Sequence, residues 1–178
     1  MDVVRTYLEL RAPSQLRPAT HAGDAIVTLV RLDPCPAEHY RALYREVGER
    51  YHWRDRLAWS DEALARHLDR PGVEVWELRV DGETAGYFEL ASHDDGSVEV
   101  AYFGLIERFF GRGLGKYLLT RAVERAWARG ATRVWLHTCT LDGAAALPNY
   151  LARGFTPYRR ETYAVELADG EREVMSEE

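Results

Sequence analysis

The stretch "IERFFGRGLGKYLLTRAVERAW", residues 106–127, joins a glycine-rich turn directly to a helical pattern. Glycines stand at positions 111, 113 and 115, and apolar residues then recur at helical spacing until Gly130. Glycine tolerates positive φ and lets a ligand approach the backbone closely. The first turn of a helix offers unpaired N–H donors and a partial positive charge. Together these features predict an anion-binding turn, and phosphate is a common occupant of such a turn.

Two familiar phosphate-binding patterns do not fit this turn. A P-loop, G-x-x-x-x-G-K-[ST], requires glycine and a hydroxyl residue where the sequence has Phe110 and Tyr117. A dinucleotide fingerprint, G-x-G-x-x-G, belongs in an early βαβ unit, whereas here the spacing is G-x-G-x-G and follows several strands. The mismatches argue against a nucleoside triphosphate or a nicotinamide cofactor.

The residues before the turn predict three consecutive antiparallel strands. "VEVWELRV" and "ETAGYFEL" flank Asp81-Gly82, a strong hairpin signal, and "SVEVAYFGLIE" follows a turn at "HDDG". Further upstream, "RTYLEL" and "AIVTLVRL" predict strands, and a helical pattern runs from Pro36 to Gly48. A second short helix is expected to begin at the N-cap Ser60 and to stop before Pro71.

The residues after the turn complete a mixed sheet. "TRVWLHTC" predicts a strand, "AALPNYLARG" a short helix ended by Gly154, and "RRETYAVEL" a last strand. Pro148 restricts the short helix to a start near Leu147 or to a kink. A sheet that begins antiparallel and ends with a strand–helix–strand crossover belongs to the α+β class.

Length and composition predict one soluble domain. A chain of 178 residues suits a single domain over residues 1–178, with an extra strand and loop at residues 1–23 and a tail at 169–178 that frays. The extra strand is expected to pair either within the sheet or with a partner subunit in a homodimer. The hydrophobic share of 46% and charged share of 29% are those of a globular protein.

Several classes of function are disfavoured by what the sequence lacks. The formal charge of −6 and the lack of a Lys/Arg cluster argue against nucleic-acid binding. No apolar run approaches the roughly 18 residues of a membrane span, and no signal-peptide pattern begins the chain, so we expect a cytoplasmic protein away from membranes. Two cysteines fit a reducing compartment, and the six histidines show no metal-ligand spacing, so no metal is expected.

Four segments in order resemble the GNAT superfamily of acetyl-CoA-dependent N-acetyltransferases. They are the hairpin with "GYFEL", the strand "VEVAYFGL", the turn-helix "FGRGLGKYLL" and the block "NYLARGF", between Val73 and Phe155. The resemblance implies a mixed, mostly antiparallel central sheet flanked by helices, with a bulged fourth strand and a strand–helix–strand crossover. It also implies acetyl-CoA as the co-substrate.

The family's cofactor motif, Q/R-x-x-G-x-G/A, matches best at Gly113 and Gly115 and leaves Phe110 where Gln or Arg is usual. By this match, backbone N–H groups of the turn would hold the pyrophosphate of coenzyme A. The preceding strand would pair with the pantetheine arm, and a glycine inside it suits a bulge or a close ligand. The implied cofactor-binding residues are Phe103, Gly104, Leu105, Phe110, Gly111, Arg112, Gly113, Leu114, Gly115 and Lys116.

Attack of an amine on a thioester needs a base, an oxyanion donor and an acid, and the resemblance implies one of each. Glu99 matches the catalytic glutamate of some histone-type members, and strand alternation places it with Ala101 and Phe103, opposite Tyr102. Glu89 on the neighbouring strand is the alternative base. The N–H of Leu105 at the bulge would stabilise the oxyanion.

Tyr150 is the implied acid, because a phenol is neutral at pH 7 and can protonate the departing thiolate. A purely structural role is the alternative, since Tyr150 would share a helical stripe with core residues. The family's asparagine seven residues before this tyrosine is Gly143 here, a second departure from the pattern.

The acceptor side is expected in "YHWRDRLAWS", residues 51–60, which is unusually aromatic for a loop. Trp53 and Trp59 line either a substrate pocket or a second small core. In a pocket, Asp55 would bind the substrate ammonium, and aromatic faces also favour cations.

These observations predict an enzyme that moves an acetyl group from acetyl-CoA to a primary amine by direct attack within a ternary complex. The aromatic loop favours a small molecule as the carrier of that amine. Phe110 and Gly143 leave a second hypothesis open, a protein that binds acyl-CoA without turning it over, as a sensor or assembly module. Acetylation of a protein N-terminus or lysine is a third.

Overall fold

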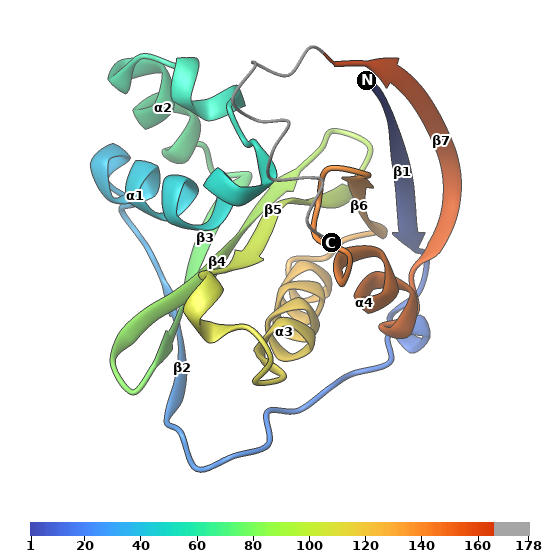
Figure 1. Cartoon of the computed structure of the whole chain (residues 1–178), viewed down its shortest axis with the longest axis horizontal. Helices are drawn as coiled ribbons and strands as arrows, with labels where there is room; N and C mark the ends of the chain where they lie inside the picture. The colour runs from blue at the N-terminus through green and yellow to red at the C-terminus, as the bar shows by residue number, and fades with distance from the viewer. Residues whose placement is uncertain (166–178) are drawn as a thin grey trace.

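The computed structural model describes residues 1–165, so the predicted tail at 169–178 lies outside the described residues. Seven strands form one sheet in the order β2-β3-β4-β5-β6-β1-β7 (Figure 1). The strands are β1 (Asp2–Leu10), β2 (Val27–Arg31), β3 (Val73–Val80), β4 (Glu83–Ser92), β5 (Ser97–Leu105), β6 (Arg133–Cys139) and β7 (Thr156–Ala164). The helices are α1 (Ala37–Gly48), α2 (Asp61–Leu68), α3 (Leu114–Ala128) and α4 (Ala146–Ala152).

The sheet is mixed and mostly antiparallel, as expected. Neighbouring strands run antiparallel everywhere except at β5 and β6, which flank the crossover helix α3 and run parallel. Their parallel pairing extends only from Ser97 opposite Arg133 to Glu99 opposite Trp135. Beyond Glu99 the two strands share no further register, so the sheet splits along the second half of β5 (Figure 1).

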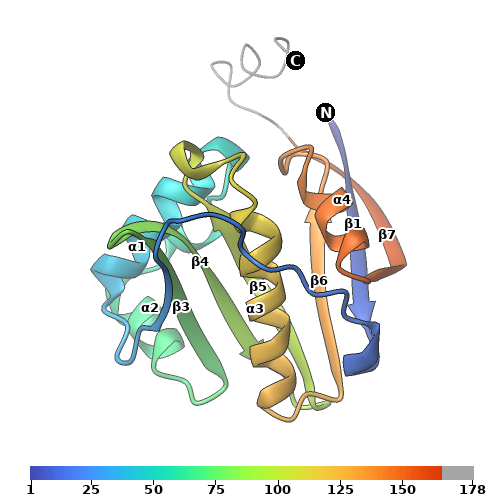
Figure 2. The ribbon, with the colours of Figure 1, turned by 90° about the horizontal axis from the view of Figure 1, so that it is seen from below.

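The N-terminal strand β1 completes the sheet from inside. It pairs antiparallel with β6 on one edge and with β7 on the other. Of the two predicted alternatives, pairing within the sheet or with a partner subunit, the structure shows pairing within the sheet. Its apolar residues Val3, Leu8 and Leu10 have no exposed surface. The following loop crosses α4 and α3 (Figure 2), where Arg17 N–H donates to Arg153 O and Ala19 N–H donates to Thr120 Oγ1.

Two helical layers cover the sheet. α3 packs on β4, β5 and β6, whereas α1 packs on β4 and β5, and α2 on β3, from the opposite side (Figures 1 and 2). α2 begins where Ser60 Oγ accepts a hydrogen bond from Ala63 N–H at 3.1 Å, as its N-cap predicts. Pro148 is the third residue of α4, a first-turn position that tolerates the missing N–H. Within residues 1–165, no helix is long and apolar enough to cross a membrane.

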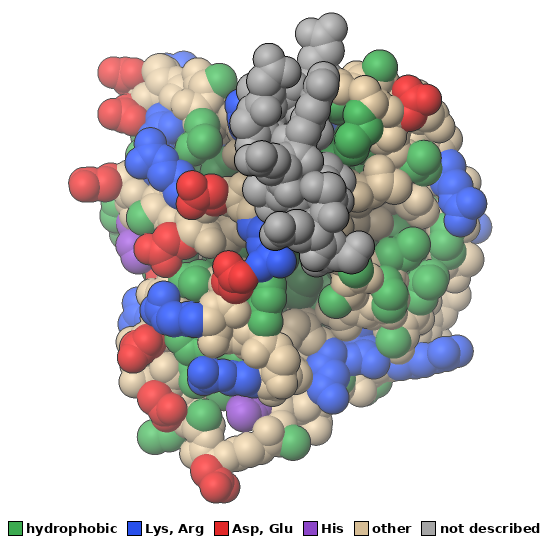
Figure 3. Space-filling view, viewed as in Figure 1, with side chains coloured by type: hydrophobic (Ala, Val, Ile, Leu, Met, Phe, Trp, Pro, Cys, Tyr) green, Lys and Arg blue, Asp and Glu red, His purple; other side chains and the backbone are tan. Residues whose placement is uncertain are grey.

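Charge is distributed unevenly over the surface. On the face shown in Figure 3, acidic side chains lie mostly over the half that carries α1 and α2. The half over β1, α4 and β7 shows mainly basic and hydrophobic side chains. The negative net charge therefore does not make this whole face acidic.

The expected bulge is present in β5, but at a different residue. Glu89 of β4 is opposite Tyr102 and Leu90 is opposite Val100, so Ala101 is the extra residue. The prediction of a bulge at Gly104 and Leu105 is therefore wrong in position. Gly104 serves packing instead, because a Cβ there would lie 2.5 Å from Val47 Cγ1 of α1.

The bulge also reverses the side-chain alternation predicted for β5. Tyr102 lies on the α1 face of the sheet, where its ring contacts Tyr44 and Trp53 with centroids 5.2 and 5.1 Å away. Phe103 points to the other side and contacts Tyr150 of α4, with centroids 6.2 Å apart. Tyr102, not Phe103, thus shares a side with Glu99.

Candidate functional site

A cavity of about 1010 Å³ lies where β5 and β6 separate. Its walls come from the glycine turn before α3, from the second half of β5, from the end of β6 with α4, and from the segment between α1 and α2. The cavity therefore joins three groups of segments whose predicted roles are cofactor binding, acyl-transfer chemistry and acceptor binding.

The glycine turn lies at one side of this cavity. Gly111 and Gly113 have φ values of 75° and 72°, which favour glycine, and no side chain caps the start of α3. The first N–H groups of α3 therefore have no capping side chain in the described chain. Phe110, Gly111, Gly113, Gly115 and Lys116 line the cavity. This combination of free donors and lysine fits a pyrophosphate.

Two residues of the implied cofactor set do not line the cavity. Arg112 has its guanidinium 5.2 Å from the centre of the Phe109 ring, and Leu114 is buried in the core with 1% of its surface exposed. Leu114 can therefore offer only its backbone groups to a ligand in the turn, whereas the Arg112 side chain is exposed beside it.

The split edge of β5 lies next to the turn. Phe103, Gly104 and Leu105 all line the cavity. Ile106 N–H donates to Ala85 O of β4 at 2.8 Å, and alternate N–H groups of a strand point to opposite edges. The N–H of Leu105 therefore points away from β4, toward the split, although Leu105 is not at the bulge.

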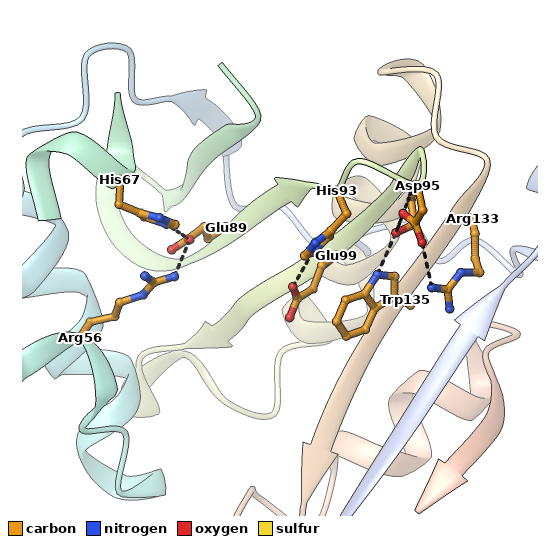
Figure 4. Close-up of polar contacts among 9 residues, drawn as sticks. Arg56, His67, Glu89, His93, Asp95, Glu99, Arg133 and Trp135 are labelled. Carbon is orange, nitrogen blue, oxygen red and sulfur yellow. Dashed lines mark hydrogen bonds and ion pairs between the residues drawn. The ribbon is translucent and has the colours of Figure 1, made fainter. Parts of the chain in front are cut away.

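Glu99 lies where β5 and β6 stop pairing. Its side chain is 17% exposed, lines the cavity, and has its Oε2 2.9 Å from His93 Nε2 (Figure 4). No local sequence pattern marks His93 as a site residue, because only the turn between β4 and β5 brings it beside Glu99. His137 of β6 also lines the cavity. Burial, and then the charge of Arg5, lower the pKa of His137, so its ring is neutral at pH 7.

Tyr150 projects from α4 into the opposite side of the split. It lines the cavity while only 7% of it is exposed, and its ring contacts Phe103 and Phe155. Burial, and then the negative charge of Asp142, raise the pKa of Tyr150 well above the usual range. The hydroxyl therefore stays protonated at neutral pH. Nearby, a Cβ at Gly143 would lie 3.2 Å from Tyr51, so this glycine lets the Tyr51 ring pack closely.

The aromatic segment between α1 and α2 divides between the two roles expected for it. Tyr51, His52, Trp53 and Asp55 line the cavity, in and beside the short 3-10 helices Glu49–Tyr51 and Asp55–Ala58. Trp59 does not line it. Its ring lies 4.1 Å from the Arg56 guanidinium and 5.3 Å from the His67 ring, in a small cluster under α2.

Glu89 does not reach the cavity, which corrects the prediction that it could replace Glu99 as the base. It is fully buried, and its carboxylate accepts from the Tyr40 hydroxyl at 2.5 Å and from Arg56 at 3.0 Å, with His67 Nε2 at 2.6 Å (Figure 4). A buried carboxylate with three partners has a structural role and does not reach a substrate amine. Its effect on the site is indirect, since Arg56 and His67, which it holds, line the cavity.

Comparisons with known proteins agree with this geometry. A family model described as "Acetyltransferase (GNAT) family" matches residues 37–155. A mycothiol acetyltransferase of Beutenbergia cavernae is 31% identical over 164 residues, which cover 80% of this chain and 52% of that protein. An uncharacterized N-acetyltransferase of Lactobacillus delbrueckii subsp. lactis is 32% identical over 117 residues, 60% of this chain and 65% of that protein. The chain thus spans about half to two thirds of the length of these curated relatives.

Solved structures show the same fold at lower identity. A GCN5-related N-acetyltransferase from Kribbella flavida has a TM-score of 0.59 at 22% identity, covering 86% of this chain and 54% of that one. An aminoglycoside acetyltransferase from an uncultured soil metagenomic sample has a TM-score of 0.62 at 15% identity, covering 80% and 94%. Because the family model matches more than half of the sequence, the chain belongs to the GNAT acetyltransferase family.

Proposed function

We propose that this protein transfers an acetyl group from acetyl-CoA to a primary amine of a small molecule, by direct attack within a ternary complex. The observation that carries the proposal is the single cavity that joins the glycine turn, the split edge of β5 and the aromatic segment after α1. Such a cavity has room for two substrates at once. Direct transfer needs both in place together, because proximity lowers the barrier only when the reacting atoms meet.

The turn side suits coenzyme A. N–H groups from Gly111 to Lys116 would hold the pyrophosphate, and the free edge of β5 at residues 103–105 would pair with the pantetheine arm as an added strand does. When bound, acetyl-CoA supplies an activated acyl group as a thioester. The positive φ of Gly111 and Gly113 is the local property of this chain that fits such a ligand.

Three groups around the split would carry the chemistry. Glu99, beside His93, would take the proton of the incoming ammonium, directly or through water. The N–H of Leu105 would donate to the developing oxyanion as a fixed dipole. Tyr150, protonated and on the other side of the split, would give its proton to the departing thiolate. Each of the three lines the same cavity, and that is what supports their joint assignment.

The acceptor is expected to be small. Tyr51, Trp53 and Asp55 of the aromatic segment enclose the acceptor end, and Arg56 and His67 form part of the same wall. Two of the similar proteins are named for small molecules, mycothiol and aminoglycosides. An enclosed aromatic wall holds a small amine better than a protein segment.

Release of free thiol from acetyl-CoA in the presence of an amine panel tests the proposal. Amino acids, polyamines, aminoglycosides and short peptides should be compared at equal concentration, with acetyl-CoA affinity measured separately by calorimetry. Turnover confined to small amines supports the proposal. Tight acetyl-CoA binding with no turnover of any amine would overturn it in favour of a binding protein, and turnover of peptides alone in favour of a protein acetyltransferase.

A further inference from the structure

Arg5 of β1 is a cation in the wall of the cavity, and it has no hydrogen-bonded acidic partner. It lines the cavity, and its NH2 donates to the Tyr163 hydroxyl at a long 3.4 Å, with the guanidinium 4.9 Å from the Tyr163 ring centre. Within residues 1–165 no carboxylate lies within ion-pair distance of Arg5, and its Nε is buried without a hydrogen-bond partner. Partial burial of a guanidinium whose hydrogen bonds go only to neutral groups lowers stability, because the desolvation of a charge is offset only when an opposite charge pairs with it.

The other charged groups around this end are already engaged. Glu99 is beside His93, and Arg56 on the opposite wall is neutralised by Glu89 (Figure 4). Asp142 accepts from Thr138 Oγ1 at 2.6 Å and from Cys139 N–H at 2.9 Å. Glu161 of β7 is opposite Arg5 and interacts with it electrostatically, but its carboxylate accepts from the Tyr7 hydroxyl at 2.8 Å and pairs with Arg159. Asp55 lines the cavity from the segment between α1 and α2. Arg5 is therefore the charged group of the β1–β6–β7 wall that a ligand can pair with.

Arg5 is also close to the proposed base. The register of β1 and β6 sets Arg5 opposite Cys139 and Tyr7 opposite His137, so Arg5 and His137 project from the same face of the sheet. Arg5, Glu99, Asp142 and Asp55 all act electrostatically on His137, and all of them line the same cavity. Since His137 is neutral at pH 7, the positive charge of this wall is concentrated on Arg5.

A guanidinium binds a carboxylate through two parallel charge-assisted hydrogen bonds, which fixes orientation as well as position. A molecule with its carboxylate on Arg5 would present a neighbouring amine toward Glu99.

We infer that the acceptor carries a carboxylate beside its amine, as an amino acid does, and that Arg5 binds this carboxylate. The inference rests on the proposed function and adds the substrate class and a specificity residue. It separates amino acids from polyamines and aminoglycosides, which offer no carboxylate to Arg5.

Amino acids and their carboxamides test the inference, because the carboxamide lacks the negatively charged carboxylate that Arg5 would bind. For wild-type protein we expect kcat/KM to be about 10- to 100-fold higher for the acid than for the amide, in line with a lost charge-assisted pair. Arg5→Gln should abolish this ratio by lowering kcat/KM for the acid alone, and Arg5→Lys should restore part of it. Acetyl-CoA affinity and melting temperature, measured on each variant, separate this effect from misfolding.

Arg160→Gln is the matched control, because Arg160 is exposed on the adjacent strand β7, is opposite Thr6 rather than Arg5, and does not line the cavity. It should keep the wild-type ratio. Turnover with the same acid-to-amide ratio in wild type and in Arg5→Gln would overturn the inference and leave the proposed function intact. Absence of turnover with acids and amides alike in wild type would overturn both.

Discussion

At the scale of single residues, Ala101 decides which side chains meet at the site. Without it, Tyr102 would follow the alternation away from Glu99, and Phe103 would point toward α1 rather than toward Tyr150. The extra residue brings Tyr102 into the acceptor wall and Phe103 against the proposed acid. Alanine carries no bulge signal of its own, so the sequence alone places the bulge at the nearest glycine, Gly104.

Tyr150→Phe is the sharpest test of the acid. Phenylalanine keeps the ring contacts with Phe103 and Phe155 but cannot donate a proton, so kcat should fall by roughly 100-fold or more. Acetyl-CoA affinity should stay within about twofold, since the ring and not the hydroxyl packs in the core. Steady-state kinetics and calorimetry give the two quantities. Tyr158→Phe, at a tyrosine 45% exposed outside the cavity, is the control, and an unchanged kcat in Tyr150→Phe would remove Tyr150 from the mechanism.

At the scale of elements, the sequence predicts best what local signals determine. Asp81-Gly82 forms the expected tight turn with φ values of 50° and 85°, Ser60 caps α2, and α3 follows the glycine turn. The position of β1 between β6 and β7 could not be predicted from the sequence, because it depends on pairing between residues far apart in the chain, such as Asp2 and Ala164. A local pattern can identify a strand but not its neighbours.

The candidate site was predicted to a similar degree. The turn residues and Tyr150, which line the cavity, could be named from the sequence because glycine spacing and the family's order of segments mark them. His93, Arg5 and His137 were missed as site residues because each enters through tertiary arrangement, the first by a turn and the others by strand pairing. The prediction for Glu89 was wrong because the sequence of a strand does not show which side chains from other elements will pair with an acid on it. In the fold, Arg56 and His67 pair with Glu89 away from the cavity.

The turn before α3 makes a prediction at this scale. Gly113→Val would force a branched side chain into a left-handed conformation and bring its Cβ 3.2 Å from Lys116 Cε, so the N–H groups that face the cavity would be displaced. Acetyl-CoA binding should be lost in calorimetry while the fold survives. Gly130→Val is the matched control, since Gly130 has φ 84° at the other end of α3 and open space for a Cβ. Normal affinity in Gly113→Val would mean that the pyrophosphate binds elsewhere.

A buried ion pair ties α3 to β3 and predicts how stability depends on pH. Glu74 is 6% exposed and accepts two hydrogen bonds of 2.8 Å from Arg125 and one from Trp76 Nε1. Burial alone would raise the pKa of Glu74, but these hydrogen bonds and the charge of Arg129 lower it from 4.5 to about 2. The stabilisation is therefore fully present above pH 4.5 and is lost as pH falls toward 2.

Glu74→Gln should lower the free energy of unfolding by about 2 kcal/mol at pH 7, a value reduced for the partial exposure of Arg125. Urea unfolding at several pH values should show the gap between wild type and variant closing between pH 4.5 and about 2. Glu124→Gln breaks an exposed pair with Arg121 and should cost no more than about 0.5 kcal/mol. A gap of constant size at all pH values would mean that the charge of Glu74 contributes nothing to stability.

At the scale of the whole molecule, the two ends of the described chain form one wall of the site. β1 and β7 lie side by side, Arg5 and Tyr163 meet across them, and both line the cavity that β5 and β6 open. The opposite wall, from the segment between α1 and α2, stands on the other half of the sheet. β1 pairs with both β6 and β7, so this wall of the cavity rests on the pairing of the N-terminal strand.

Leu8→Ala tests whether this half unfolds together with the rest. Leu8 is fully buried in β1, so truncation should lower the free energy of unfolding by about 2–5 kcal/mol. We expect one urea transition, coincident by far-UV circular dichroism and tryptophan fluorescence, with a lower midpoint and an unchanged m-value. Leu57→Ala, at a residue 39% exposed, should shift the midpoint far less. Two separated transitions in Leu8→Ala would instead show that β1 and β7 detach first, and the cavity wall that carries Arg5 and Tyr163 would then be a unit that opens without global unfolding.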